Sequence, residues 1–297
     1  MLTKIFYKID NFCKHFQKEF EKHLLQDGSK ILKSRMAMSE IMTIVIYFHH
    51  SGYRNFKKYY LEHICQYKTK AFPNRLSYNR FVELMQSVLI PMIIYFQQCA
   101  KGKVTGISFV DSTSLKVCDN RRINQHKVFC GLARRGKTSM GWFYGFKLHL
   151  VVNDQGQIIN FKLTEGNTDD RNSNVFSELK KGLFGKLFAD RGYISKKLTN
   201  SLIKDNIELI TKLKKNMKPR VIPAFDKVLL RKRAVIETIN DELKNIMQIE
   251  HSRHRSPHNF LVNLVSGIIA YQFKTKKPSI RMTKKDIEKL SNLPMVI

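Results

Sequence analysis

Residues 106–113 read GISFVDST, and this stretch decides the fold. Its first five residues are mostly apolar, with the β-branched and aromatic side chains typical of a buried strand, and they lead directly into Asp111. Residues 186–190 (KLFAD) have the same form and lead into Asp190. Parallel strands of an α/β sheet present their functional side chains at their carboxyl ends. We therefore expect the two aspartates to meet if their strands are neighbours.

Further strands and helices surround these two stretches. Residues 153–156 (NDQG) have the composition of a hairpin turn. The predicted strands are residues 105–117, 145–152, 158–163, 183–189 and 207–213, and the predicted helices are residues 196–204 and about 227–247. This order predicts a mixed α/β sheet with flanking helices.

The first 103 residues read as helical instead. Apolar residues at 5, 9, 12, 16 and 20 recur at helical spacing, Ser39 is the expected N-cap of a second helix, and residues 56–67 and 77–100 repeat the pattern. We expect an all-α, DNA-binding domain over residues 1–103, an α/β domain over 104–275 and a basic C-terminal tail over 276–297. Residues 76–84 are either a helix placed on DNA or a core helix of a small bundle, since the pattern alone fits both.

The charge of the chain points to a polyanionic partner. With 53 Lys and Arg against 24 Asp and Glu, the formal net charge is +29. Nucleic acid is the commonest polyanion, although a basic ribosome-type or membrane-surface protein fits the charge as well. The five cysteines are widely spaced and form no Cys-x-x-Cys pair, which argues against a disulfide framework or a zinc ribbon. The apolar run 88–96 is too short to cross a membrane, so we expect a cytoplasmic protein.

A third acidic residue stands in the predicted helix at 227–247. At about 100° per residue, Ile236, Ile239, Leu243 and Ile246 form its buried stripe. On one flank of that stripe lie Arg233, Glu237, Asn240 and Lys244, and Glu242 falls on the opposite flank. We therefore predict that Glu237 joins the two aspartates.

Three carboxylates in this arrangement suit phosphoryl transfer. Two divalent ions shared between carboxylates can activate an attacking oxygen and stabilise a leaving oxygen, and Mg²⁺ prefers oxygen ligands. A purely structural interpretation is that the aspartates cap strands and that Glu237 pairs with Arg233 on the surface. Asp170, in the helix-entry loop 169–171, is the main rival ligand.

The same residues resemble a known family. The motifs FVDST at 109–113, FADRGY at 188–193 and Arg233-x3-Glu237-x6-Lys244 are similar to those of the DDE transposases of bacterial insertion sequences, over roughly residues 104–275. The resemblance implies a ribonuclease-H-like fold, two Mg²⁺ or Mn²⁺ ions and DNA transposition. The chain departs from the pattern at Leu230, where several of these enzymes have a Tyr.

The expected partner is double-stranded DNA, both the inverted repeats at the element ends and the target. The residues that we expect to contact it are Arg233, Lys244, Arg191, Lys212, Lys214 and Lys215, with Arg75 and Arg80 in the helical domain. Holding two element ends together implies a homodimer or a larger assembly. The resemblance also implies that the protein acts at the bacterial nucleoid.

The environments of three side chains in or beside the predicted hairpin have two alternative interpretations each. We expect Lys147 and His149 to face solvent, with a place beside the metal site as the alternative. Trp142 is expected in the hairpin core, with base stacking as the alternative. For the whole chain, a domesticated DNA-binding protein without chemistry and a structure-selective nuclease on the same fold compete with the transposase.

Overall fold

The computed structural model describes residues 1–27, 34–213, 217, 221–250 and 254–281. The chain forms two compact units, each made of two separate parts of the sequence. Residues 1–100 and 242–274 form what we call the helical unit, and residues 101–241 with the segment that begins at Thr275 form the sheet unit. Among the described residues, no helix is long and apolar enough to cross a membrane.

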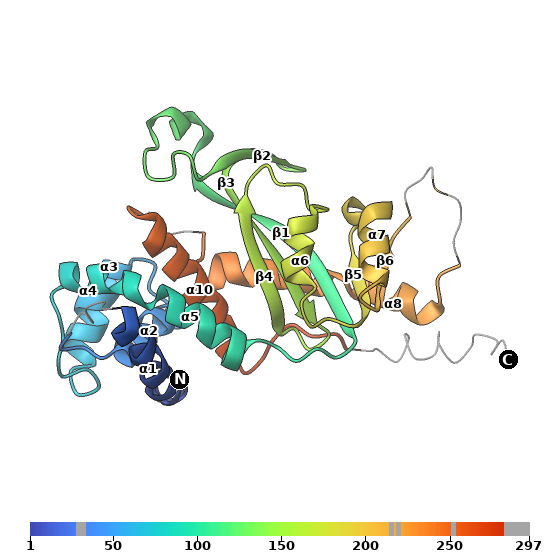
Figure 1. Ribbon diagram of the computed structural model, residues 1–297. Helices are drawn as coiled ribbons and strands as arrows, with labels where there is room; N and C mark the ends of the chain where they lie inside the picture. The colour runs from blue at the N-terminus through green and yellow to red at the C-terminus, as the bar shows by residue number, and fades with distance from the viewer. Residues whose placement is uncertain (28–33, 214–216, 218–220, 251–253, 282–297) are drawn as a thin grey trace. The chain divides into compact units, whose positions relative to one another are not determined.

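The sheet unit is built on six strands in the order β2-β3-β1-β5-β6, with β4 paired to β3 (Figure 1). These strands are β1 (Ile107–Cys118), β2 (Arg134–Thr138), β3 (Gly141–Asn153), β4 (Ile158–Glu165), β5 (Gly185–Ala189) and β6 (Ile207–Thr211). Strand β3 runs antiparallel to β1, β2 and β4, whereas β5 is parallel to β1 and β6. An antiparallel meander continued by parallel strands is the ribonuclease-H-like arrangement, so the expected fold class is confirmed.

Five of these strands were predicted from sequence, and β2 was not. Its sequence, RRGKT, has little β propensity. It becomes a strand because its backbone pairs with residues 141–145 of β3, while β4 pairs with the later part of the same edge. The tertiary partner, which is invisible to a local pattern, therefore determines β2.

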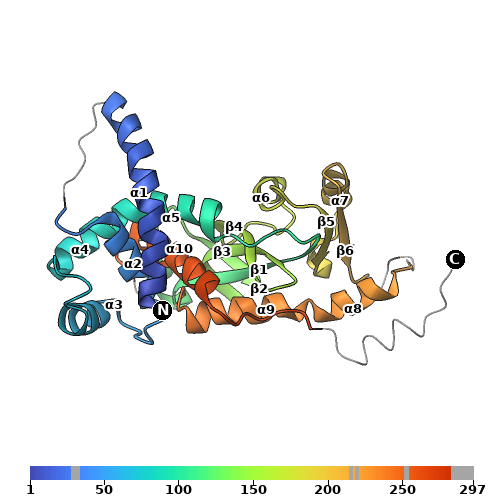
Figure 2. The same ribbon diagram turned by 90° about the horizontal axis from the view of Figure 1, so that it is seen from below.

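Helices cover both faces of the sheet. Figure 2 shows α6 (Ser173–Leu179) and α7 (Lys196–Ile203) on one face and α8 (Ala224–Lys232) and α9 (Ala234–Asp241) on the other. Short 3-10 turns, η4 (Asn120–Gln125) and η5 (Arg191–Tyr193), follow β1 and β5. The core under α6 and α7 is built from apolar residues of the sheet and the two helices, including Val110, Val151, Leu187, Leu198 and Leu202.

The helix predicted at 227–247 is present but not regular. It is divided at Arg233 into α8 and α9, and it ends in a π-helical turn, η6 (Glu242–Ile246), in which the Met247 amide donates to the carbonyl of Glu242 at 2.9 Å. A π turn needs more residues than an α turn, so the face presented by later residues changes. Ile246 is consequently 51% exposed, while Met247 is buried. The prediction that Ile246 belongs to the buried stripe is therefore wrong.

The helical unit contains α1 (Leu2–Asp27), α2 (Met38–Phe48), α3 (Phe56–Lys58), η1 (Tyr59–Tyr67), α4 (Tyr78–Met85), η2 (Gln86–Val88), α5 (Leu89–Tyr95), η3 (Phe96–Ala100) and α10 (Pro257–Phe273). The all-α character of the N-terminal region is therefore as expected. Helix α10 is apolar around most of its circumference and packs on α2 and α5. A helix of this kind must be buried, which explains why residues 242–274 join the N-terminal helices although we expected them in the domain at 104–275.

One predicted helix cap is wrong. Helix α2 begins at Met38, and its N-cap is Ala37, whose amide donates to the Glu40 carboxylate at 2.7 Å. Ser39 is buried instead, and its hydroxyl donates to Asp10 of α1 at 3.0 Å. Ser39 therefore joins two helices because a partner on α1 competes for its hydroxyl.

Gly145→Ala is expected to destabilise the sheet unit strongly. Gly145 lies on β3 opposite Lys116, and a Cβ there would meet the Leu115 carbonyl oxygen at 2.0 Å. Backbone atoms in a central strand pair cannot move aside, so we expect a loss of about 3 kcal/mol, or roughly 6–12 °C in Tm by thermal circular dichroism. Gly192→Ala is the matched control, because its Cβ would meet nothing within 4 Å. An unchanged Tm in Gly145→Ala would contradict the β1–β3 register.

Candidate active site

Asp111 lies on the central strand of the sheet unit. It pairs with Leu150 of β3 and is mostly buried, and β1 continues beyond it to Cys118. The expectation that Asp111 ends its strand is therefore wrong. Parallel pairing with β5 stops at Phe109, whereas antiparallel pairing with β3 goes on. Asp111 thus stands where the strand loses one neighbour, which opens one side of it.

Asp190 directly follows the end of the neighbouring strand, β5. Phe109 of β1 pairs with Phe188 of β5, and their rings stack with centroids 5.3 Å apart. Each aspartate follows its phenylalanine by two residues along the chain. Strand β5 ends at Ala189, so Asp190 is exposed, and its carboxylate accepts the Arg191 amide at 2.7 Å.

Helix α9 and Arg233, the residue directly before it, supply the remaining polar groups at this face. The Asn240 side-chain amide donates to the Asp111 carboxylate at 3.1 Å. One and two turns earlier, Glu237 and Arg233 form an ion pair of 2.6 Å between Oε1 and Nη2. Steps of three and four residues keep these three side chains on one helix face. Asn240 holds the Asp111 carboxylate, and the sequence had placed it only on the flank of the helix without a role.

The electrostatic environment of Asp111 is unfavourable for its charge. Burial raises the pKa of Asp111 to about 6, and the carboxylates of Glu237 and Asp170 push it in the same direction. The Arg233 guanidinium and a hydrogen bond from the Ser112 backbone lower the pKa in part. A buried carboxylate beside two others is a group that a bound cation stabilises.

The donor chemistry at this face fits a hard divalent cation. Asp111 and Glu237 interact electrostatically, and Asp190 follows the neighbouring strand end. Within the described residues, no three His, Cys, Asp or Glu side chains are gathered closely enough to form a complete metal site. In this conformation Arg233 supplies the positive charge next to Glu237. Asp111 and Glu237 are therefore the acidic residues of this face that could hold a metal.

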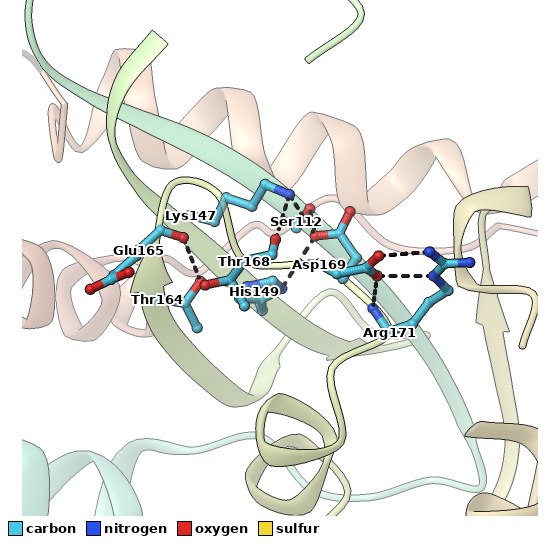
Figure 3. A network of polar contacts seen from close by, with 9 residues as sticks. Ser112, Lys147, His149, Thr164, Glu165, Thr168, Asp169 and Arg171 are labelled. Carbon is cyan, nitrogen blue, oxygen red and sulfur yellow. Dashed lines mark hydrogen bonds and ion pairs between the residues drawn. The ribbon is translucent and has the colours of Figure 1, made fainter. Parts of the chain in front are cut away.

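Asp170 is held in a polar network beside Asp111, shown in part in Figure 3. Its carboxylate accepts the Ser112 hydroxyl at 2.8 Å and the Lys147 ammonium at 3.3 Å. Lys147 also donates to the Thr168 carbonyl at 2.8 Å. The Lys147 charge and the Ser112 hydroxyl therefore already stabilise the Asp170 carboxylate, which makes it a weaker candidate ligand than Asp111.

Lys147 and His149 do not face solvent, so that expectation is wrong. Lys147 is half-buried and His149 is fully buried, because the loop at 166–171 folds over this part of β3. His149 Nδ1 lies 3.7 Å from Asp170, and Nε2 contacts the Thr164 hydroxyl at 2.9 Å. Burial lowers the pKa of His149 to about 4 although the nearby Asp170 charge opposes the shift. The imidazole is therefore neutral at physiological pH and acts as a support for the loop.

Like Asn240, Tyr193 is a polar residue to which the sequence assigned no role. It ends the FADRGY motif, and its buried hydroxyl lies close to the Ser112 side chain. Burial and the charges of Asp111 and Asp170 raise its pKa well above the usual value. The Tyr193 ring also packs edge-on against Phe176 of α6. Its signal in the sequence was its position three residues after Asp190, at the end of the same turn.

The expected DNA-contacting residues fall into different environments. Arg191 and Lys212 are exposed, while Lys214 and Lys215 lie outside the described residues. Lys244 belongs to the helical unit and pairs with Glu250 at 3.2 Å. Leu230 is buried in α8, so no side chain at that position is available for a phosphate.

The two arginines of the helical unit have intramolecular partners. Arg75 donates to the carbonyls of Thr69 and Phe72 at 3.2 and 3.3 Å. Arg80 pairs with Glu83 at 2.9 Å on the exposed face of α4. An exposed pair of this kind is worth at most about 1 kcal/mol, so a phosphate can compete for Arg80.

A basic recess adjoins the polar network of the sheet unit. It has a volume of about 380 Å³ and is lined by several cations, including Arg135, Lys137, Lys147 and Arg171. Trp142 also lines it and is 60% exposed, with the Lys137 ammonium 5.6 Å from its ring. The expected core position of Trp142 is therefore wrong, and base stacking by an exposed indole remains available.

The chain was also compared with known proteins. The profile of a family described as "Transposase DDE domain" matches residues 101–257. A search of curated proteins found no match. Among solved structures, the chain is similar to the piggyBac transposase in a synaptic complex with hairpin DNA, at 10% identity and a TM-score of 0.45, covering 99% of this chain and 80% of that chain.

A second solved structure is more distant. It is the Mos1 strand transfer complex, at 12% identity and a TM-score of 0.23, covering 87% of this chain and 84% of that chain. Likenesses at these values do not identify a site, so the assignment rests on the profile, which matches more than half of the chain. By that match, this chain belongs to the transposase DDE domain family.

Proposed function

We propose that the chain catalyses metal-dependent hydrolysis of a phosphodiester at the ends of a DNA element and then joins the freed 3′-OH to target DNA. The observation that carries the proposal is the half-buried Asp111 on β1, whose carboxylate accepts the Asn240 amide of α9. The Arg233–Glu237 pair lies one to two turns earlier along the same helical face, and Asp190 directly follows the neighbouring strand β5. Because the chain carries a net charge of +29, a polyanionic substrate is also favoured.

Asp111, Asp190 and Glu237 would hold two Mg²⁺ or Mn²⁺ ions, which supply activation of the attacking oxygen and stabilisation of the leaving oxygen. In the first step a water attacks phosphorus and the bond to the 3′ oxygen breaks. In the second step the resulting 3′-OH attacks a target phosphodiester, and the target's own 3′ oxygen leaves. Asn240 orients the Asp111 carboxylate, and Arg233 positions Glu237.

Basic side chains would position the DNA backbone without reading its sequence. Arg191 follows Asp190 directly and is exposed, and Lys212 extends from the end of β6. We propose that these two contact phosphates near the carboxylates, with Lys214 and Lys215 following in the chain. Two element ends held together require at least two copies of the protein, so we propose a homodimer in the synapsed state.

Recognition of the element ends is proposed for the helical unit. Helix α4 buries Phe81, Leu84 and Met85 and leaves Asn79 and Arg80 exposed. Because α10 supplies much of the core of this unit, residues 1–103 alone would lack that core. The assignment is therefore tested in the full chain, where Arg80→Ala should weaken binding to the element ends more than binding to unrelated duplex. Equal weakening on both DNAs would assign Arg80 a nonspecific contact instead.

Metal binding tests the proposed chemistry directly. Calorimetric titration of the metal-free protein with Mg²⁺ in the presence of DNA should show saturable binding, and Asp111→Asn should weaken it strongly. Gly192→Ala should bind as the parent does. Absence of saturable binding by the parent protein would favour a DNA-binding protein without chemistry. A structure-selective nuclease is the other competing function, and it would cleave DNA without ever forming a joined product.

A further inference from the structure

A cavity formed by described residues of the helical unit has no role so far. It has a volume of about 780 Å³, within the range of about 300–1,000 Å³ that small-ligand pockets occupy. Its walls come from α2, α3, α4 and α10 and the segment before α10. It therefore lies entirely within one compact unit and is separate from the carboxylates of the sheet unit.

The wall of this cavity is positively charged. Three exposed cations line it, Arg54, Lys57 and Arg255, and none of its described lining residues is acidic. The cavity thus favours an anionic ligand over a cationic or neutral one. Helix α10 begins here at Pro257, and the side chain of its N-cap, Ser256, makes no capping hydrogen bond. The first amides of α10 are therefore not satisfied by their own cap and add to the preference for an anion.

Aromatic and apolar side chains lie deeper than the cations. Phe56 and Tyr78 are half-buried, Phe48 is buried, and Val82 and Val262 complete this layer. The Lys57 ammonium lies 5.7 Å from the centre of the Tyr78 ring. A ring face next to cations is the combination on which nucleobases stack while their phosphates are held.

A buried amide provides the polar contact at depth. Asn263 on α10 is 8% exposed and lines the cavity, and its Nδ2 has no hydrogen-bond partner among the described residues. The Asn259 Oδ1, one turn earlier on the same wall, also lacks a partner there. A buried amide without a partner costs about 1–3 kcal/mol, so its presence points to a ligand that satisfies it. A nucleobase edge carries both hydrogen-bond acceptors and donors, so it can satisfy an unpartnered amide donor and an unpartnered amide acceptor.

We propose that this cavity takes one unpaired nucleotide of a DNA strand, with its base against Tyr78 and the Asn263 amide and its phosphate at Lys57 and Arg255. The proposal rests on the proposed function in that DNA is the substrate. It adds a second DNA site, in the helical unit, that recognises a base outside the duplex stack. A DNA strand is favoured over a free nucleotide because the chain as a whole carries a charge of +29.

The test is binding of the full-length protein, in EDTA, to two duplexes that differ only in one nucleotide. In one duplex 2-aminopurine is paired, and in the other it lies opposite an abasic site. We expect about tenfold tighter binding to the second duplex, equivalent to about 1.4 kcal/mol. Stacking on Tyr78 should also quench the 2-aminopurine emission, and Tyr78→Leu should abolish the quenching. Equal affinities for both duplexes in the parent protein would overturn the proposal.

Two variants separate a ligand role from a structural role. Asn263→Leu should remove the preference for the unpaired nucleotide without lowering Tm, because it replaces an unpartnered buried amide with an apolar group of similar size. A retained preference in this variant would count against the site. Lys57→Ala should weaken binding to the second duplex. Lys58→Ala, its exposed neighbour on α3 that does not line the cavity, should bind it as the parent does.

Two further experiments decide whether the ligand is a DNA strand or a free nucleotide, and they test the cavity proposal independently of the proposed catalytic function. Free dAMP and a competing duplex with the unpaired nucleotide are compared as displacers of the bound duplex. If free dAMP acts at the lower concentration, the cavity binds a free nucleotide, and the DNA proposal is overturned. Because binding is measured in EDTA, it does not depend on cleavage. Asp111→Asn should therefore lose cleavage but keep the preference for the unpaired nucleotide. Cleavage without that preference in the parent protein would defeat the cavity proposal alone.

Discussion

Glu237→Gln is expected to abolish metal-dependent cleavage while the protein still folds and binds DNA. The amide keeps the shape of the side chain but is a poor ligand for Mg²⁺. Loss of a metal ligand removes several kcal/mol of transition-state stabilisation, so we expect at least about a 10³-fold lower cleavage rate. Glu237 is 56% exposed and its pair with Arg233 is superficial, so Tm should change little. The measurement is the rate of strand cleavage on DNA that carries the inverted repeats flanking the gene.

Glu242→Gln is the matched control on the same stretch of helix. Glu242 belongs to the helical unit, where its carboxylate pairs with Lys274 at 2.6 Å. We expect this variant to keep nearly full cleavage and to lose only the stability contributed by that ion pair. Loss of cleavage in Glu242→Gln with full activity in Glu237→Gln would show that the other acidic residue is the ligand, and the site would have to be rebuilt around it.

Asp111→Asn is expected to make the metal-free protein more stable while abolishing cleavage. The Asp111 pKa is raised from 3.8 to about 6, mainly because burial disfavours its charge. A shift of about two units corresponds to about 3 kcal/mol of destabilisation at neutral pH. The neutral Asn removes this cost and still offers an oxygen to the Asn240 amide. Thermal unfolding in EDTA at pH 8 should therefore show a higher Tm for the variant than for the parent.

The pH dependence of this difference has a definite sign. The folded chain binds the Asp111 proton more tightly than the unfolded chain does, so the contribution to stability is full below 3.8 and is lost as the pH rises through about 6. The advantage of Asp111→Asn over the parent should shrink as the pH is lowered from 8 through about 6. Mg²⁺ should raise the Tm of the parent far more than that of the variant. A lower Tm for the variant at pH 8 would show that the Asp111 charge is well solvated.

The sheet, including the strands that precede the two aspartates, could be predicted because strands depend on local pattern. Apolar runs ending in Asp111 and Asp190 indicated two buried strands, and the periodicity of residues 227–247 indicated a helix with Glu237 and Asn240 on one flank. The observed contact between Asn240 and Asp111 follows from that helical rotation.

The surroundings of the site depended on interactions that the sequence does not display. The burial of Lys147 and His149 results from the loop at 166–171. This loop follows β4 in the chain, so the pattern of residues within β3 does not reveal it. The exposure of Ile246 results from the π turn, which the spacing of apolar residues does not predict. The cavity beside Tyr78 is closed by α10, some 180 residues later, so its lining had no common signal in the sequence.

Formation of a joined DNA product tests the central claim most directly. A labelled duplex carrying the element end is incubated with the protein, a supercoiled target plasmid and either Mg²⁺ or EDTA. We expect cleavage at the element end and transfer of the label to the plasmid with Mg²⁺ only. Asp111→Asn, Asp190→Asn and Glu237→Gln should give neither product, although each variant should still bind the duplex. Undiminished cleavage and joining by these three variants would contradict the central claim.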